Sequence, residues 1–198
     1  LADDVENGID VLSDMMRHSL IDPKELKMEE SVVLEEIKRG EDEPSDHVHE
    51  VHLEERWGKH PFGKPVIGTR ESVSSFEREH LMSYMDRRYR GGNILLGVAG
   101  NVDAMDVAKW AEERLGDIPA GGGLEKIDRP KGGRKETYQA KDVEQVHFCI
   151  GSDGTSLYDE DLYVNAVMDS ALGGSMSSRL FQEIREKRGL AYSVGSYS

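Results

Sequence analysis

The chain of 198 residues carries 39 acidic and 25 basic side chains, which gives a formal net charge of −14 and a pI near 4.9. A chain of that charge repels nucleic acid and anionic membranes, so we expect neither as a partner. Its composition, 37% hydrophobic, suits a globular core, and no apolar run approaches the about 20 residues that a membrane-spanning helix needs.

The first part of the chain is dominated by apolar residues at helical spacing. A Gly- and Pro-rich loop over 58–72 interrupts this pattern, and Ser45 or Asp46 is the expected N-cap of the helix before it. The predicted elements are helices over 5–20, 23–41, 45–57, 75–90 and 102–118, with a short buried strand over 93–100. Together they predict an α+β layer, which we assign to a first domain, residues 1–118.

Residues 119–135 are rich in Gly, Pro and Lys and have little apolar periodicity, which predicts a linker. A second domain is expected over 136–198. Its predicted elements are a strand or hairpin arm over 136–152, helices over 159–174 and 177–189 with Gly173 and Gly174 at the first C-terminus and Ser177 as N-cap of the second, and a strand from 190. Because the sequence begins in mid-helix without methionine and ends within this strand, we expect a piece of a longer protein.

Cys149 is the only cysteine, and it lies in the strand-like run VHFCI. An intramolecular disulfide is therefore impossible, and a reducing, cytoplasmic compartment is expected. We interpret the side chain as a buried, unreactive thiol.

Two acids interrupt the apolar stripe of the second helix. Glu29 and Glu36 are seven residues apart, so on an ideal helix they lie within about 20° of each other, with Val32 on one side and Val33 on the other. Burying an unpaired carboxylate costs several kcal/mol, so buried glutamates here would need an arginine, a lysine or a metal as partner. The alternative is an amphipathic helix whose glutamates lie at the edge of the stripe and reach water.

Several motifs occur in the order of one known family. They are EESVVLEEI, HPFGKPVIGTRESV, RRYRGGNILLGVAGNVD and SSRLFQEIREKRGLAYSVGS, and they extend over essentially the whole chain. In these motifs the sequence resembles the insulinase and pitrilysin family of zinc metallopeptidases, specifically its processing-peptidase branch. The resemblance implies repeated two-layer α+β units, here the later part of one unit and the first part of the next.

The resemblance also implies a zinc site. In that family an inverted His-x-x-Glu-His motif supplies two ligands and the general base, and a distal glutamate completes the site. Glu36 matches this distal ligand, and Glu29 matches an accessory acid that helps to position the site. The His-x-x-Glu-His motif is absent from the sequence, and family spacing predicts it about forty residues before Leu1. Three histidines of the 45–57 helix, His47, His49 and His52, lack zinc-binding spacing, so we interpret them as a solvated helix face.

In the second unit, the family's substrate-contacting arginine and tyrosine correspond to Arg185 and Tyr192. An arginine can hold substrate carbonyls or carboxylates, and a tyrosine hydroxyl can donate to the oxyanion formed by attacking water. Without the resemblance, a surface arginine and a core-packed tyrosine would be the simpler interpretation.

Three hypotheses about function follow. The first is a fragment of a zinc-dependent endopeptidase that cleaves extended or unfolded peptides, inactive as given, working as a homodimer or as a paired-domain clamshell. The second is a non-catalytic subunit of the same fold that binds peptides or scaffolds an oligomer. The third is a small acidic binding module, which would leave the ordered motifs unexplained. Buried acids at Glu29 and Glu36 would favour the first hypothesis, since an inactive subunit has no need for them.

Overall fold

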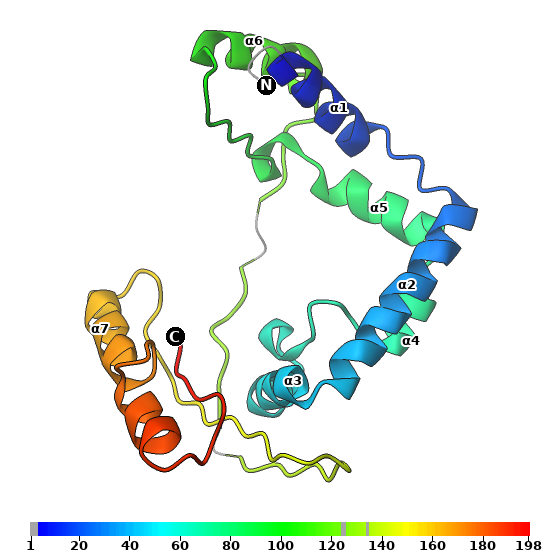
Figure 1. The fold of residues 1–198 in the computed structure, drawn as a ribbon. Coiled ribbons are helices and arrows are strands. Elements are labelled where there is room, and N and C mark those ends of the chain that lie inside the picture. Colours follow the sequence, from blue (N-terminus) through cyan, green and yellow to red (C-terminus); the bar gives the residue numbers. More distant parts are fainter. Residues whose placement is uncertain (1–3, 124–125, 134) are drawn as a thin grey trace. The chain divides into compact units, whose positions relative to one another are not determined.

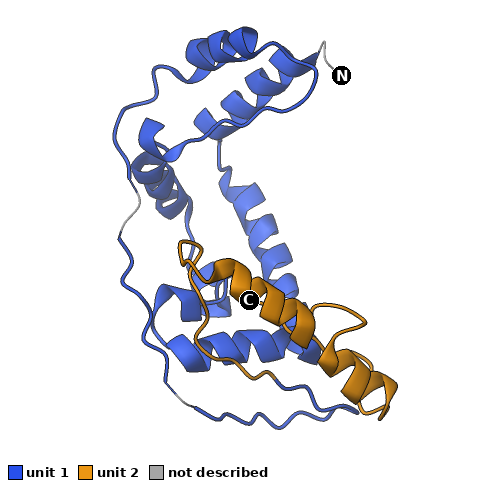
Figure 2. Cartoon of the chain, turned by 90° about the vertical axis from the view of Figure 1, so that its left-hand side faces the viewer, with its two compact units in different colours: residues 1–148 blue, residues 149–198 orange. Residues whose placement is uncertain are grey.

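The computed structural model describes residues 4–123, 126–133 and 135–198. The chain divides into two compact units, residues 1–148 and 149–198, drawn in blue and orange in Figure 2. The boundary between these units lies C-terminal to the predicted linker, residues 119–135. The linker belongs to unit 1 because its contacts are with that unit.

Unit 1 is built from helices joined by loops and short 3₁₀ turns (Figure 1). The predicted helices are confirmed, with ends that shift by a few residues, and one short helix, α4, forms where only a loop is predicted. The elements are α1 (Val5–Arg17), α2 (Pro23–Asp42), α3 (Pro44–Trp57), η2 (Pro61–Gly63), α4 (Arg70–Ser74), α5 (Arg78–Arg88), η3 (Gly91–Asn93) and α6 (Ala104–Leu115). The sequence signal for α4 is Thr69, whose side chain and that of Ser72 form a capping box.

Helices α1 and α6 lie side by side and are joined by ion pairs (Figure 1). The guanidinium of Arg114 on α6 donates to Asp10 at 2.8 Å and to Glu6 at 3.0 Å. Arg17 of α1 donates to Asp117 at 2.7 Å, just beyond the end of α6. These arginines therefore connect two helices that are about a hundred residues apart in the sequence.

Helix α2 packs against α3 and α4. Asp22 caps its N-terminus by accepting from the backbone amides of Lys24 and Glu25, with proline at the first position. The predicted N-cap of α3 is wrong: Glu43, not Ser45 or Asp46, caps this helix, because Pro44 occupies its first position.

The predicted strands are not formed within residues 4–123, 126–133 and 135–198. Residues 94–99 and 146–152 have no regular secondary structure and make no ladder hydrogen bonds, and Leu95 and Val146 are 96% and 87% exposed. A strand is stabilised by hydrogen bonds to a neighbouring strand, and neither segment finds one among the described residues. The predicted α+β class is therefore not confirmed by the described part of the chain.

The described part of the predicted linker is held against unit 1. The amide of Gly91 donates to the carbonyl of Pro119 at 3.1 Å, and the amide of Gly92 donates to the carbonyl of Gly121 at 2.9 Å. Further along, Lys135 pairs with Glu55 of α3 at 2.8 Å. The low apolar periodicity of this segment correctly indicates that it forms no helix or strand, but the segment is a loop bound to unit 1 by hydrogen bonds and an ion pair.

Unit 2 contains α7 (Leu162–Leu172) and the π-helix η4 (Phe181–Glu186). Gly173 caps α7 as predicted, and a Cβ atom at this position would lie only 2.2 Å from the amide nitrogen of Ser196. The predicted N-cap Ser177 is wrong, because the second helix begins at Arg179 and is preceded by the buried Ser178. Cys149 is half-buried rather than buried, and burial raises the pKa of its thiol.

Within the described ranges of both units, no helix combines the length and the apolar character needed to cross a membrane.

Candidate functional site

The face of α2 that carries Glu29 and Glu36 is exposed, so of the two interpretations the one in which these glutamates reach water is confirmed. Met28 and Val32 share this face and are 57% and 51% exposed. An adjoining face, which carries Ile37 at 7% exposure, packs toward the neighbouring helices. We call Met28, Glu29, Val32 and Glu36 the open face of α2. It combines two carboxylates with uncovered apolar side chains.

The acids with partners lie elsewhere on α2. Glu30 has a side chain only 16% exposed and pairs with Lys27 at 2.6 Å. Glu41 accepts two hydrogen bonds from the guanidinium of Arg70, at 3.3 Å from Nε and 2.5 Å from Nη2. These hydrogen bonds hold the pKa of Glu41 below its ordinary value and tie the end of α2 to α4. By contrast, Glu36 makes no hydrogen bond or ion pair with the described residues.

No group of three or more His, Cys, Asp or Glu side chains among the described residues is arranged to hold a metal ion. His47 of α3 instead lies 3.2 Å from the amide oxygen of Gln139 and 3.7 Å from a carboxylate oxygen of Glu50. Glu36 is thus a single exposed carboxylate that could supply one metal ligand. The remaining ligands are not found in the described part of this chain.

In unit 2 the structure brings Arg185 and Tyr192 together. The guanidinium carbon of Arg185 lies 4.7 Å from the ring centroid of Phe181 and 5.2 Å from that of Tyr192. Both distances are in the range of cation–π interactions, so the arginine contacts both aromatic rings. Tyr192 is 85% exposed, which excludes core packing of its ring within unit 2.

The backbone between Arg185 and Tyr192 reverses direction, which brings the two side chains together. Phe181–Glu186 form a π-helix, a conformation that occurs frequently at functional sites. Gly189 then adopts a positive φ of 60°, and the amides of Gly189 and Leu190 donate to the carbonyls of Arg185 and Ile184, each at 3.0 Å. This glycine-dependent cap reverses the chain, so a residue seven positions after Arg185 contacts its side chain.

Sequence reasoning did not identify Phe181 as part of this cluster. Its spacing of four residues from Arg185 was an available signal, because residues at i and i+4 of a helix lie on one face. The role of Arg70 as the partner of Glu41 had no comparable signal, since these residues are 29 positions apart and meet only through packing.

Two family models match the chain. Residues 1–70 match the model described as insulinase (peptidase family M16), and residues 75–198, more than half of the chain, match the model described as peptidase M16 inactive domain.

Curated relatives match over nearly the whole chain. An uncharacterized zinc protease of Bacillus subtilis is 42% identical over 96% of this chain and 46% of its own length. An uncharacterized zinc protease of Rickettsia felis is 36% identical over 100% of this chain and 48% of its own length. The chain therefore spans about half the length of the curated relatives it matches.

Solved structures share the fold. A peptidase M16 inactive domain from Pseudomonas fluorescens superposes with a TM-score of 0.79 at 20% identity, over 98% of this chain and 47% of that one. A protease from Helicobacter pylori gives a TM-score of 0.77 at 18% identity, over 98% of this chain and 49% of that one. With both family models in sequence order, the chain belongs to the M16, or insulinase, family of peptidases.

Proposed function

We propose that a full-length protein carrying this sequence is a zinc-dependent endopeptidase for extended or unfolded peptides. The observation that supports this most directly is the open face of α2, where Glu36 and Glu29 stand uncovered between apolar side chains. An accessible carboxylate without an internal partner is suited to bind a metal, whereas an ion-paired one such as Glu41 is not. The zinc-protease names of the relatives agree with this role. On the single-cysteine argument we place the protein in the cytoplasm.

The residues of this chain fit only part of a zinc site. Glu36 would be one ligand and Glu29 an acid that positions the site. The two histidine ligands would come from a His-x-x-Glu-His segment that the sequence does not contain. In such a site zinc supplies an acidified water for attack on a peptide carbonyl. The 198 residues alone are therefore proposed to be inactive.

Unit 2 would supply the substrate side. Because its guanidinium already contacts Phe181 and Tyr192, Arg185 would lose less side-chain freedom when it binds a substrate carbonyl or carboxylate. The exposed hydroxyl of Tyr192 would donate to the developing oxyanion. In this proposal the peptide is held between paired domains, within one chain or across a homodimer.

The test compares Glu36→Gln with Glu35→Gln in the full-length protein. Both remove one exposed negative charge from the same helix, but Glu35 lies about 100° around the helix from Glu36. We expect Glu36→Gln to lose zinc, measured as metal content per chain, and to lose hydrolysis of a quenched peptide, while Glu35→Gln keeps both. A Glu36→Gln protein with full zinc content and parental activity would refute the proposal.

The alternative is a non-catalytic peptide-binding or scaffolding subunit of the same fold. Two observations favour it: most of the chain matches the inactive-domain model, and the exposure of Glu29 and Glu36 removes burial as an argument for catalysis. Full-length protein that binds the quenched peptide without cleaving it, with zinc supplied in excess, would establish this alternative.

A further inference from the structure

Of the two aromatic rings that Arg185 contacts, the closer one belongs to Phe181. The guanidinium carbon lies over this ring at 4.7 Å from its centroid, whereas the centroid of the Tyr192 ring is 5.2 Å away. Phe181 and Arg185 are the first and fifth residues of the same π-helix. A π-helix is rare and occurs frequently at functional sites. The contact between these two side chains therefore calls for an explanation beyond ordinary packing.

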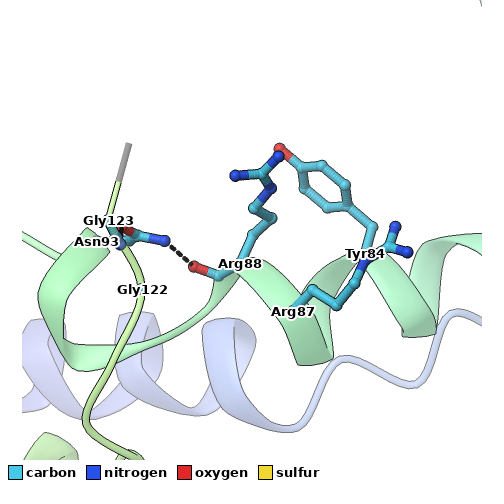
Figure 3. Close-up of a pocket in the computed structure, with 6 residues that line it drawn as sticks. All are labelled: Tyr84, Arg87, Arg88, Asn93, Gly122 and Gly123. Atoms are coloured by element: carbon cyan, nitrogen blue, oxygen red, sulfur yellow. Dashed lines mark hydrogen bonds between the residues drawn. The ribbon is translucent and has the colours of Figure 1, made fainter. Parts of the chain in front are cut away.

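Helical spacing alone does not produce such a contact. In the pocket of unit 1 shown in Figure 3, Tyr84 and Arg88 are also four residues apart on one helix, α5. There the guanidinium of Arg88 lies beside the hydroxyl of Tyr84. The position of Arg185 over the ring of Phe181 is thus specific to its own surroundings and is not a general result of the i, i+4 spacing.

Phe181 is the better fixed of the two rings. It is half-buried and belongs to a helix, so the backbone restricts its rotamers. Tyr192 is 85% exposed and lies in residues 190–198, which form no helix or strand. A guanidinium that contacts both rings therefore takes its orientation chiefly from Phe181.

In the described part of the chain, no short ion pair competes with the rings for Arg185. A carboxylate oxygen of Glu186 is 4.0 Å from Nε of Arg185, at the limit for an ion pair. Glu183 is paired with Lys187 at 2.5 Å. The side chain of Arg185 is 37% exposed, so its N–H donors are accessible to a ligand.

We propose that Phe181 is a positioning residue for substrate binding and acts through Arg185. Its ring supports the guanidinium, whose N–H donors lie in the guanidinium plane and stay free for a substrate carbonyl or carboxylate. An aromatic side chain is required, because an aliphatic one has no ring quadrupole to attract the cation. This inference rests on the proposed substrate role of Arg185 but not on catalysis, since a peptide-binding subunit would use the same contact.

NMR spectroscopy of the 198-residue chain tests the contact itself. Protons over a ring face are shifted upfield, so the Nε–H and Cδ–H signals of Arg185, assigned by their loss in Arg185→Lys, report its position. We expect Phe181→Leu to move these signals toward those of a free arginine, while Phe181→Tyr keeps most of the shift. Phe148→Leu, at a phenylalanine that is 75% exposed, is the matched control and should leave them unchanged. Unchanged Arg185 signals in Phe181→Leu would overturn the proposal.

The role in binding is tested in the full-length protein. The measured constant is KM for the quenched peptide or, if the peptide is bound without cleavage, its Kd. We expect Phe181→Leu to raise this constant about two- to fivefold, the effect of losing an exposed cation–π contact, with little change in kcat. Phe181→Tyr should recover most of the loss. In an Arg185→Ala background, Phe181→Leu should have no further effect, because Phe181 acts through the arginine.

The double variant separates this inference from the proposed function. If Arg185→Ala changes neither KM nor Kd, the substrate role of Arg185 is refuted, and the role of Phe181 with it. If Arg185→Ala weakens binding but Phe181→Leu does not, the role of Phe181 alone is overturned. It is also overturned if Phe181→Leu weakens binding equally with and without Arg185, or if Phe181→Tyr is as damaging as Phe181→Leu, since neither result fits a ring that orients the arginine.

Discussion

The open face of α2 in unit 1 and the Arg185 cluster in unit 2 differ in how complete they are. Phe181, Arg185 and Tyr192 lie within twelve positions, and a π-helix followed by a glycine cap brings them together. Glu29 and Glu36 share a face but have no partner among the described residues. Side chains that are close in sequence can assemble by local geometry alone, whereas a metal site drawn from distant segments needs all of those segments.

The sharpest test of this contrast is metal binding by the 198-residue chain. One carboxylate cannot hold zinc without further ligands, so titration calorimetry should detect no tight, stoichiometric binding. Circular dichroism should likewise be unchanged by chelators. Tight binding that His49→Ala abolishes would instead identify the histidines of α3 as a metal site and would remove the distinction between the two regions.

The next largest effect is expected for Tyr192→Phe in the full-length protein. If the hydroxyl donates to the oxyanion, its interaction is stronger in the transition state than with bound substrate, so kcat should fall about 10²–10³-fold with little change in KM. Tyr163→Phe, at another highly exposed tyrosine of unit 2, is the control. Steady-state kinetics with zinc content checked in each variant would decide, and kcat within about twofold of the parent would exclude the oxyanion role.

Arg185→Ala distinguishes the two members of this cluster. An arginine that holds substrate contributes to the ground state as well as to the transition state, so this variant should chiefly raise KM. Arg185→Lys should recover only part of the loss, because lysine keeps the charge but lacks the planar group that contacts Phe181 and Tyr192. A large fall in kcat at unchanged KM would indicate instead that Arg185 acts through the orientation of Tyr192.

The packing of the C-terminal segment of unit 2 against the end of α7 can be tested at Gly173. A Cβ atom here would overlap the backbone of Ser196, at 2.2 Å from its nitrogen, so Gly173→Ala should destabilise unit 2 by about 1–3 kcal/mol. Gly154→Ala is the matched control, since its Cβ would meet nothing within 4 Å. Denaturant unfolding of both variants would measure the difference. Equal stability would mean that the segment carrying Tyr192 is not held against α7.

The open face of α2 and the Arg185 cluster also show which features could be predicted from the sequence. Periodicity and capping signals located the long helices, and the match of REKRGLAY to a family motif paired Arg185 with Tyr192. Both inferences use residues within a few turns of one another. The helical wheel likewise placed Glu29 and Glu36 on one face correctly, because helix geometry is local.

The failures share a physical cause in long-range packing. A wheel cannot tell which face a neighbouring helix covers, so it left open whether Glu29 and Glu36 are buried or reach water. The apolar run at 93–100 predicts a short buried strand, but a strand exists only with a hydrogen-bonded neighbour.

The smallest expected effect concerns Glu41, an acid of α2 that pairs with a side chain of another helix, Arg70 of α4. Because the hydrogen bonds from Arg70 lower the pKa of Glu41, the folded chain holds this proton less tightly than the unfolded chain. The resulting stabilisation is fully present above the pKa of an unfolded glutamate, about 4.3, and is lost as pH falls through the lower pKa of the folded state.

Glu41→Gln should therefore lower the thermal midpoint slightly at neutral pH, since the pair is partly exposed, and the difference from the parent should narrow as the solution is acidified. Glu54→Gln, at an exposed carboxylate of α3, provides the control for removing one negative charge from an acidic chain. Thermal unfolding at a series of pH values would measure both. A difference that stays constant into acid would mean that Glu41 contributes through packing rather than through its charge, and unit 1 would then lack the ion pair that distinguishes Glu41 from the uncovered Glu36.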